Sequence, residues 1–416
     1  MNFFQYKNNQ LYAEDVPVSK IAAEVGTPVY IYSHATIHRH FSVFQKAFSS
    51  LDPLICFSMK CNSNLAILNQ MAKWGGGVDI VSGGELYRAL QAGVDPQKIV
   101  YSGVGKTEAE ITQALRAGIL LFNVESEAEL ELIHKVASRL DCKAPISLRV
   151  NPNIDPKTHP YISTGMKKSK FGIDVSTALK IYQKAKKLSH LQVIGLDCHI
   201  GSQLTQVRPF IDALKKLKIL IQKIRALGIP LCYLDLGGGL GIRYQDETPP
   251  SPDQYAQAII QEVKDLNLKL VFEPGRVLMG NAGILVTRTL YTKKTSTKEF
   301  VIVDAAMNDL IRPAFYGSYH EIQPALRKKS KKKKTDIVGP ICESGDFFAK
   351  DRLLPPVQSG DLLAIFSAGA YGFAMSSNYN ARPRAAEVLV KGREFRVIRQ
   401  RESLEDLVRG EGVPSF

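Results

Sequence analysis

Short apolar runs alternate with amphipathic stretches through the middle of the chain. Eight of these runs are rich in valine, isoleucine and leucine, and each has the length and composition of a buried strand. The predicted strands are 54–58, 77–81, 98–101, 119–123, 146–150, 193–199, 233–236 and 268–273. Stretches with helical spacing separate them, at 64–73, 84–92, 107–117, 126–139, 176–188, 207–227 and 252–266. This strict alternation predicts an α/β fold with a parallel sheet, and eight units favour a (β/α)8 barrel over a doubly wound sheet.

The pattern changes beyond residue 280. Runs at 284–291, 300–304, 362–366 and 386–400 have strand character, and no long helical stretch separates them. We therefore expect a barrel domain over residues 29–280 and a second, β-rich domain, a β-barrel or sandwich, over residues 281–416. The first 28 residues are expected to pack with the β-rich domain.

The composition is that of a soluble enzyme, with 45% hydrophobic and 23% charged residues among 416. The N-terminal sequence lacks the pattern of a signal peptide, and no apolar stretch approaches the roughly 18 residues of a membrane span. We expect a cytoplasmic protein without a membrane partner. The six cysteines form no C-x-x-C pair and no metal-ligand spacing with histidine, so free thiols and no metal site are predicted.

The formal net charge is +14, and part of it comes from the run RKKSKKKK at 327–334. Such a run can bind nucleic acid or another anionic surface. No aromatic residues interleave with the lysines, and no nucleic-acid-binding motif accompanies them. We interpret the run as a solvated, mobile loop and expect no nucleic-acid partner.

Polar residues and glycines gather at the carboxyl ends of the predicted barrel strands, where barrels build their active sites. This clustering at one end is the main evidence from the residues for an enzyme. The candidates are Lys60, Asp79, Arg149, His199, Ser202, Gly237 to Gly239, and Glu273 to Arg276.

Two of these features together suggest a cofactor. The glycines at 237–239 follow the seventh strand, where backbone N–H groups can approach a phosphate closely. Lys60 follows an apolar strand, where a desolvated amine can lose its proton and attack a carbonyl. A phosphate site and such a lysine are what pyridoxal phosphate requires. Glu273 is suited to the pyridinium nitrogen, although a salt bridge with Arg276 is the alternative.

Nine segments, in this order, resemble the fold-type III pyridoxal-phosphate-dependent decarboxylases, and the later ones resemble the branch of that family that acts on diaminopimelate. The segments are FSMKCNSN at 57–64, VDIVSGGEL at 78–86, CHIGSQ at 198–203, GGGLG at 237–241, EPGR at 273–276, DAAMNDLIRP at 304–313, GPICESGD at 339–346, GAYG at 369–372 and SNYNARP at 377–383. The resemblance spans nearly the whole chain. Cys61, where the family often has alanine, and Asp197, where histidine is common, are small departures.

The resemblance implies a role for each candidate. Lys60 would bind pyridoxal phosphate covalently, His199 would stack on its ring, and Glu273 would face the ring nitrogen. Asp79 and Arg149 would stand near the lysine and the ring hydroxyl. The phosphate would be held by Ser202, Gly237, Gly238, Gly239, Tyr371 and the backbone of Pro274, Gly275 and Arg276.

The resemblance also implies the substrate and the assembly. Meso-2,6-diaminopimelate would lose the carboxylate at its D-configured carbon to give L-lysine and CO2, the last step of lysine biosynthesis, and Cys342 would protonate the resulting carbanion. The substrate would be bound by Arg276, Arg312, Tyr316, Glu343 and Tyr371. A homodimer with shared active sites is expected, because in this family the Cys-Glu segment reaches into the partner's barrel. An amino-acid racemase and a non-catalytic cofactor-binding homologue are the alternatives.

Overall fold

The computed structural model describes residues 1–154 and 169–416. They form two compact units. The barrel unit contains residues 41–243 and 247–277, and the β-rich unit contains residues 1–40, 244–246 and 278–416. The sequence prediction placed the domain boundaries after residues 28 and 280.

Eight parallel strands close into a barrel, because the last of them, β13, pairs with the first, β5. All eight predicted strands are confirmed to within a few residues at their ends. In order around the barrel they are β5 (Leu54–Ser58), β6 (Gly77–Ile80), β7 (Ile99–Tyr101), β8 (Leu121–Val124), β9 (Ala144–Asn151), β11 (Leu191–Asp197), β12 (Tyr233–Asp235) and β13 (Lys269–Phe272), and the short β10 (Ile173–Asp174) pairs with β9. The (β/α)8 prediction is therefore correct, and the doubly wound alternative is wrong.

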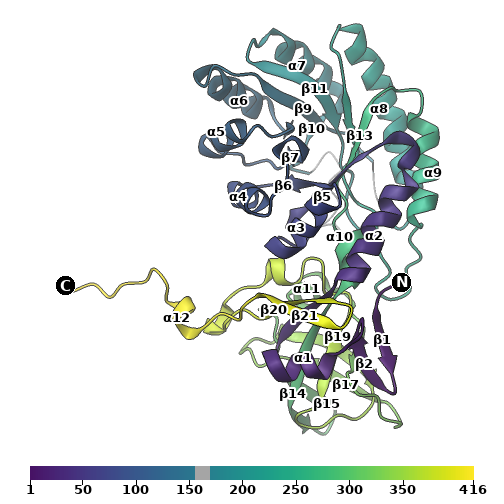
Figure 1. Cartoon of the computed structure of the whole chain (residues 1–416), viewed down its shortest axis with the longest axis vertical. Coiled ribbons are helices and arrows are strands. Elements are labelled where there is room, and N and C mark those ends of the chain that lie inside the picture. Colours follow the sequence, from purple (N-terminus) through teal and green to yellow (C-terminus); the bar gives the residue numbers. More distant parts are fainter. Residues whose placement is uncertain (155–168) are drawn as a thin grey trace. The chain divides into compact units, whose positions relative to one another are not determined.

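The helices between these strands lie where the apolar spacing predicted them, and Figure 1 shows α5, α6, α7 and α8 outside the strands. The helices are α3 (Leu65–Lys73), α4 (Gly83–Gln91), α5 (Glu108–Ala117), α6 (Glu127–Arg139), α7 (Val175–Lys187), α8 (Arg208–Ala226) and α9 (Pro252–Val263). Thr107 and Glu110 form a capping box at the start of α5, which satisfies two backbone N–H groups that the helix leaves unpaired. Among the described residues, no helix is long and apolar enough to cross a bilayer.

The β-rich unit is built on a sheet with the strand order β18-β17-β15-β14-β4-β20-β21. Its strands are β4 (Val29–Ser33), β14 (Gly283–Lys294), β15 (Glu299–Val303), β17 (Lys333–Val338), β18 (Phe347–Leu354), β20 (Ala386–Lys391) and β21 (Glu394–Arg399), and β16 (Ile322–Pro324) and β19 (Leu362–Ile365) pair beside β14. Figure 1 also labels β1 (Phe4–Lys7), β2 (Gln10–Ala13), α1 (Val18–Val25), α2 (His34–Ala47), α10 (Arg276–Met279), α11 (Arg312–Tyr316) and α12 (Leu404–Leu407), and the short β3 (Val16–Pro17) pairs with β2. Phe4, Leu11 and Ile21 share a buried core with Ile284 and Val388, which joins the N-terminal segment to this sheet.

Three elements of this unit differ from the sequence prediction. Residues 29–33 were expected in the barrel domain with no strand predicted there, but they form β4, which pairs with β14 on one side and β20 on the other, and all five are buried. The run 386–400 is a hairpin, in which Gly392 adopts a φ of 59° at the turn. The lysine run is not simply a solvated loop, because Lys333 and Lys334 begin β17 and pair with Leu354 and Leu353 of β18.

Candidate functional site

The site in the barrel unit begins with an ion pair at the ends of two neighbouring strands. Lys60 follows β5 and Asp79 lies in β6, and Lys60 Nζ lies 3.0 Å from Asp79 Oδ2. The same oxygen accepts a hydrogen bond from Ser58 Oγ at 2.9 Å. The buried Asp79 carboxylate therefore holds the amine in place. The Lys60 side chain is 39% exposed, so the amine is not desolvated as the sequence suggested. Asp79 Oδ1 is buried and has no hydrogen-bond partner among the described residues.

Glu273 lies immediately after β13 and is buried. Its Oε1 atom accepts a hydrogen bond from Ser102 Oγ at 3.2 Å. Carboxylate oxygens of Glu273, Asp197 and Asp235 all lie within 4.8 Å of one another. Burial, and then the Asp79 carboxylate, raise the pKa of Glu273 to about 7.

The pKa values of the two aspartates in this cluster are also raised, which favours their protonated form. Burial, and then the Glu273 carboxylate, hold the pKa values of Asp197 and Asp235 well above their usual range. Several negative charges cannot be kept this close in a buried site, so the cluster holds protons at neutral pH. A cationic group placed beside Glu273 would relieve the same repulsion.

The glycines after β12 pack against His199. A Cβ on Gly237, whose φ is 61°, would lie 2.5 Å from His199 Nδ1, so only glycine fits there. The backbone N–H of Gly238 donates to His199 Nδ1 at 3.2 Å, and that of Gly237 donates to Asp235 Oδ1 at 2.9 Å. These two N–H groups, predicted as phosphate donors, are therefore already used within the chain. Nδ1 of His199 accepts, and burial followed by the cations Arg149 and Lys60 holds its pKa well below the usual range, so this histidine is neutral.

A cationic side chain, a hydroxyl and backbone N–H groups come together beside the glycines. Arg276 Nη2 donates to Ser202 Oγ at 3.1 Å, and Arg276 is buried. The backbone N–H groups of Gly239 and Gly275 take part in no hydrogen bond among the described residues. A Cβ on Gly275 would lie 3.1 Å from Ser58 Cβ, so the backbone here is closely approached by the end of β5. The neighbouring Pro274 oxygen accepts from the Ser58 N–H at 3.2 Å.

These residues fit pyridoxal phosphate. Ser202, Arg276 and the N–H groups of Gly239 and Gly275, which are unpaired within residues 1–154 and 169–416, are suited to a phosphate. The buried, proton-sharing carboxylate of Glu273 is suited to a cationic ring nitrogen. Lys60 supplies the amine that the cofactor's aldehyde requires.

Arg149 is committed to carboxylates of the chain. Its Nη1 atom lies 3.0 Å from Glu125 Oε1, and its Nε atom lies 3.9 Å from Asp197 Oδ2. Burial opposes its charge, but Glu125 and then Asp197 outweigh burial and raise its pKa. Arg149 is thus a fixed cation at the end of β9.

The remaining predicted residues belong to the β-rich unit. Arg312 is buried in α11, where its Nη2 donates to Ser318 Oγ at 3.2 Å and its Nε to His320 Nε2 at 3.3 Å. Its guanidinium also lies 5.2 Å from the ring centre of Tyr244 and 5.7 Å from that of Tyr316. The structure therefore brings Arg312 and Tyr316 together, and Arg312 is no surface charge.

Cys342 and Glu343 lie in an exposed loop that hydrogen bonds fix in place. The Cys342 N–H donates to Asn380 Oδ1 at 3.1 Å, and Tyr379 Oη donates to Glu343 Oε2 at 3.3 Å. Tyr371 adopts a φ of 56°, a conformation that L residues rarely take, and is half-buried.

Asp346 anchors the cysteine loop, and the sequence reasoning gave it no role. It is buried, and its Oδ2 accepts from the Ile341 N–H at 2.7 Å while its Oδ1 accepts from the Met307 N–H at 2.7 Å. Gly339 approaches so closely that a Cβ there would lie 2.4 Å from Asp346 Oδ2. An aspartate ending the GPICESGD segment was the available signal. Asp235, the last residue of β12, was missed in the same way although it interrupts an apolar run.

Comparison with known proteins decides the family. The model described as "Pyridoxal-dependent decarboxylase, pyridoxal binding domain" matches residues 34–280. Diaminopimelate decarboxylase of Pseudomonas aeruginosa is 52% identical over 413 residues, covering 99% of this chain and 99% of the relative. The chain belongs to the diaminopimelate decarboxylase family.

Solved members of the diaminopimelate decarboxylase family share its fold. The Helicobacter pylori enzyme, complexed with L-lysine, has a TM-score of 0.91 and 45% identity, over 94% of this chain and 98% of that chain. The enzyme from M. jannaschii, in co-complex with L-lysine, has a TM-score of 0.95 and 40% identity, over 99% of this chain and 98% of that chain. The family requires pyridoxal phosphate, in agreement with the fit of the barrel residues to that cofactor.

Proposed function

We propose that this chain decarboxylates meso-2,6-diaminopimelate to L-lysine and CO2, with pyridoxal phosphate as its cofactor. The observation that carries the proposal is the Lys60–Asp79 pair at the strand ends of a barrel whose relatives are named diaminopimelate decarboxylases. Two solved relatives hold L-lysine, the product of the proposed reaction.

The barrel residues hold the cofactor and set its charge. When bound, pyridoxal phosphate accepts the electron pair that remains on Cα as CO2 leaves. Lys60 Nζ is the attachment point, and Asp79 orients it. Glu273 favours a protonated ring nitrogen, because a buried carboxylate lowers the energy of a nearby cation. His199 is neutral, so it can lie against the ring without adding a second cation.

The residues of the β-rich unit select the substrate and return the proton. Arg312 and Tyr316, with Arg276, bind the distal carboxylate, since an arginine fork matches a carboxylate with two hydrogen bonds. Glu343 binds the distal ammonium, and Tyr371 contacts the substrate and the phosphate. The Cys342 S–H bond breaks as a C–H bond forms at Cα, and the thiolate is then reprotonated from water. The net reaction consumes one proton and releases one CO2.

Reductive labelling tests the assignment of Lys60. The protein is saturated with pyridoxal phosphate, reduced with borohydride, digested and mapped by mass spectrometry. We expect one labelled peptide, containing Lys60, and no label or CO2 release in Lys60→Ala. Lys73→Ala, which changes a helical lysine of the same unit, should keep both. A label on any other lysine would overturn the assignment.

We also propose a homodimer with shared sites, in the cytoplasm. Cys342 and Glu343 are exposed and belong to the β-rich unit, whereas Lys60 belongs to the barrel unit, which suits a site completed across a two-fold axis. All six cysteines are free thiols, in keeping with a reducing compartment.

Complementation tests the shared site. Lys60→Ala and Cys342→Ala chains should each be inactive, and an equal mixture that exchanges subunits should regain about a quarter of wild-type activity, because one site in each heterodimer has no defect. The control pair is Lys60→Ala with His199→Ala, both in the barrel unit, which should regain nothing. A verified Lys60→Ala/Cys342→Ala heterodimer without activity would show that the cysteine acts in its own chain or is not the proton donor.

A further inference from the structure

The β-rich unit carries a basic groove that the decarboxylation does not use. Two adjoining hollows, of about 290 and 450 Å³, share Lys294, Glu299 and Lys333 in their linings. The first is also lined by Lys293 and the second by Lys298 and Lys334. We call these two hollows together the lysine groove.

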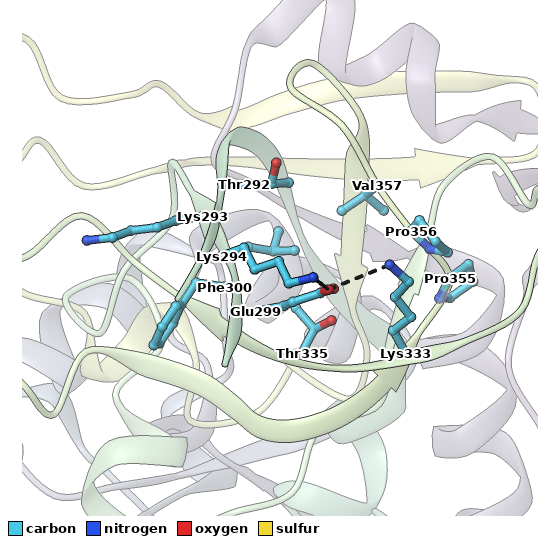
Figure 2. Close-up of a pocket in the computed structure, with 11 residues that line it drawn as sticks. Thr292, Lys293, Lys294, Glu299, Phe300, Lys333, Thr335, Pro355, Pro356 and Val357 are labelled. Atoms are coloured by element: carbon cyan, nitrogen blue, oxygen red, sulfur yellow. Dashed lines mark ion pairs between the residues drawn. The ribbon is translucent and has the colours of Figure 1, made fainter. Parts of the chain in front are cut away.

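At the centre of the groove two ammonium groups share one carboxylate oxygen. Glu299 Oε1 lies 3.8 Å from Lys294 Nζ and 3.6 Å from Lys333 Nζ, and Figure 2 shows both lysines directed at it. One carboxylate cannot neutralise two ammonium groups, so a positive charge remains. Lys298 differs, because it lies 2.6 Å from Asp336 Oδ2.

The lysines are presented by paired strands and not by a loose tail. Lys294 lies opposite Glu299 in the antiparallel β14–β15 pair, and Lys333 and Lys334 lie opposite Leu354 and Leu353 of β18. At Lys333 and Lys334 β17 pairs with β18 alone, because its pairing with β15 begins at Asp336. Lysines often protect such an unpaired edge, and here Lys333 also lines both hollows together with Lys294 and Glu299.

The run that leads into the groove increases the charge. Residues 327–334 carry seven cationic side chains among eight, half of the formal net charge of +14. Lys328 pairs with Asp361 at 2.9 Å, and the Arg327 guanidinium lies 3.5 Å from the ring centre of Tyr6, so the start of the run is also anchored. Among the described residues, Lys293 and Lys334 form no ion pair with a carboxylate.

We propose that the lysine groove binds a linear polyanion of the polyphosphate class, a chain of closely spaced phosphates without bases. Side chains alternate between the two faces of a strand, so the groove gathers its cations from two strands, Lys293 and Lys294 of β14 and Lys333 and Lys334 of β17. A chain of closely spaced negative charges can contact several of these lysines at once. Both hollows are concave, which suits a narrow chain and not a flat bilayer. Phe300 is the one aromatic residue in the two linings, too little to stack successive bases of a nucleic acid.

The structure gives two substitutions with opposite expected effects. Removing lysines should weaken binding. The triple variant Lys293→Gln/Lys333→Gln/Lys334→Gln should lose affinity at least about tenfold, since each exposed ionic contact changes the affinity a few-fold. Glu299→Gln should strengthen binding about threefold, because it releases Lys294 and Lys333 from their shared carboxylate. Affinity should also fall steeply with added salt.

The test measures binding of fluorescently labelled inorganic polyphosphate to the full-length, cofactor-loaded enzyme by anisotropy. Lys187→Gln/Lys215→Gln/Lys223→Gln removes the same charge from exposed helix positions of the barrel unit and is the matched control. We expect a loss with the groove triple, a gain with Glu299→Gln and little change with the control, while decarboxylation stays unaltered. Equal losses in both triples, or no gain with Glu299→Gln, would overturn the groove as the site. Tighter binding of a single-stranded RNA with the same number of phosphates would overturn the assignment to a chain without bases.

Discussion

Asp79 holds Lys60 through a single carboxylate oxygen, at 3.0 Å from the lysine nitrogen. The aspartate is fully buried while the lysine is partly exposed, so the carboxylate sets the position of the amine. Ser58 shares that oxygen and fixes the carboxylate in turn.

Asp79→Asn should therefore slow decarboxylation about tenfold or more, because the amine loses its charged partner and its position. Cofactor capture, followed by visible absorbance, should slow as well. Ser58→Ala is the milder control, since it leaves the ion pair in place. An Asp79→Asn enzyme with wild-type rates of capture and turnover would show that the pair is only structural.

Glu273 makes the stability of the cofactor-free protein depend on pH. With its pKa raised from 4.5 to about 7, the folded state binds more protons than the unfolded state between these values. The free energy of unfolding therefore falls as pH rises through this window, by about 3 kcal/mol at most. Glu273→Gln should reduce the dependence of the unfolding free energy on pH and raise the melting temperature at pH 7.5. Calorimetry from pH 5 to 8 measures both. An unchanged slope would mean that Glu273 stays ionised.

Arg312→Lys should raise KM for meso-diaminopimelate about tenfold or more, since lysine keeps the charge but loses the planar fork. Cofactor affinity, measured by absorbance titration, should not change. Arg352→Lys is the matched control, because Arg352 also lies over a ring, 4.0 Å from the centre of Tyr319, and donates to the His320 oxygen. Equal effects of the two substitutions would remove Arg312 from the substrate site.

Asp346→Asn should impair proton delivery, because an amide cannot accept from both the Ile341 and Met307 N–H groups, and the cysteine loop loosens. We expect kcat/KM to fall about tenfold or more and the solvent deuterium isotope effect on kcat to rise. Asp361→Asn is the control, since Asp361 accepts from the Gln358 N–H in a different loop. A lower melting temperature with an unchanged isotope effect would indicate a structural role alone.

The barrel could be predicted from the sequence because its strands are buried on both faces, so each reads as an unbroken apolar run. No strand was predicted at 29–33, and the domain boundary expected after residue 28 put these residues with the barrel, although they form β4 of the β-rich unit. β17 carried no apolar signal at its start, because Lys333 and Lys334 are exposed cations and the buried Thr335 and Asp336 that follow are polar.

The sequence predicted which site residues lie at the ends of strands, but not which hydrogen bonds they form. Lys60, Asp79, His199 and Glu273 all lie at the carboxyl ends of barrel strands, as their positions in the sequence indicated. That Gly237 and Gly238 donate to Asp235 and His199 depends on where those acceptors lie in space, which residue spacing does not define.

The most direct test of the account is the stoichiometry and selectivity of the reaction. The purified enzyme, loaded with pyridoxal phosphate, is given meso-diaminopimelate, L-lysine or L-ornithine, and CO2 and amino-acid products are measured together. We predict one L-lysine and one CO2 for each meso-diaminopimelate consumed. The other two amino acids should turn over at least about a hundredfold more slowly, because they lack the distal carboxylate and leave Arg312 and Arg276 unpaired. Comparable CO2 release from L-ornithine, or CO2 release from meso-diaminopimelate without L-lysine, would contradict the account.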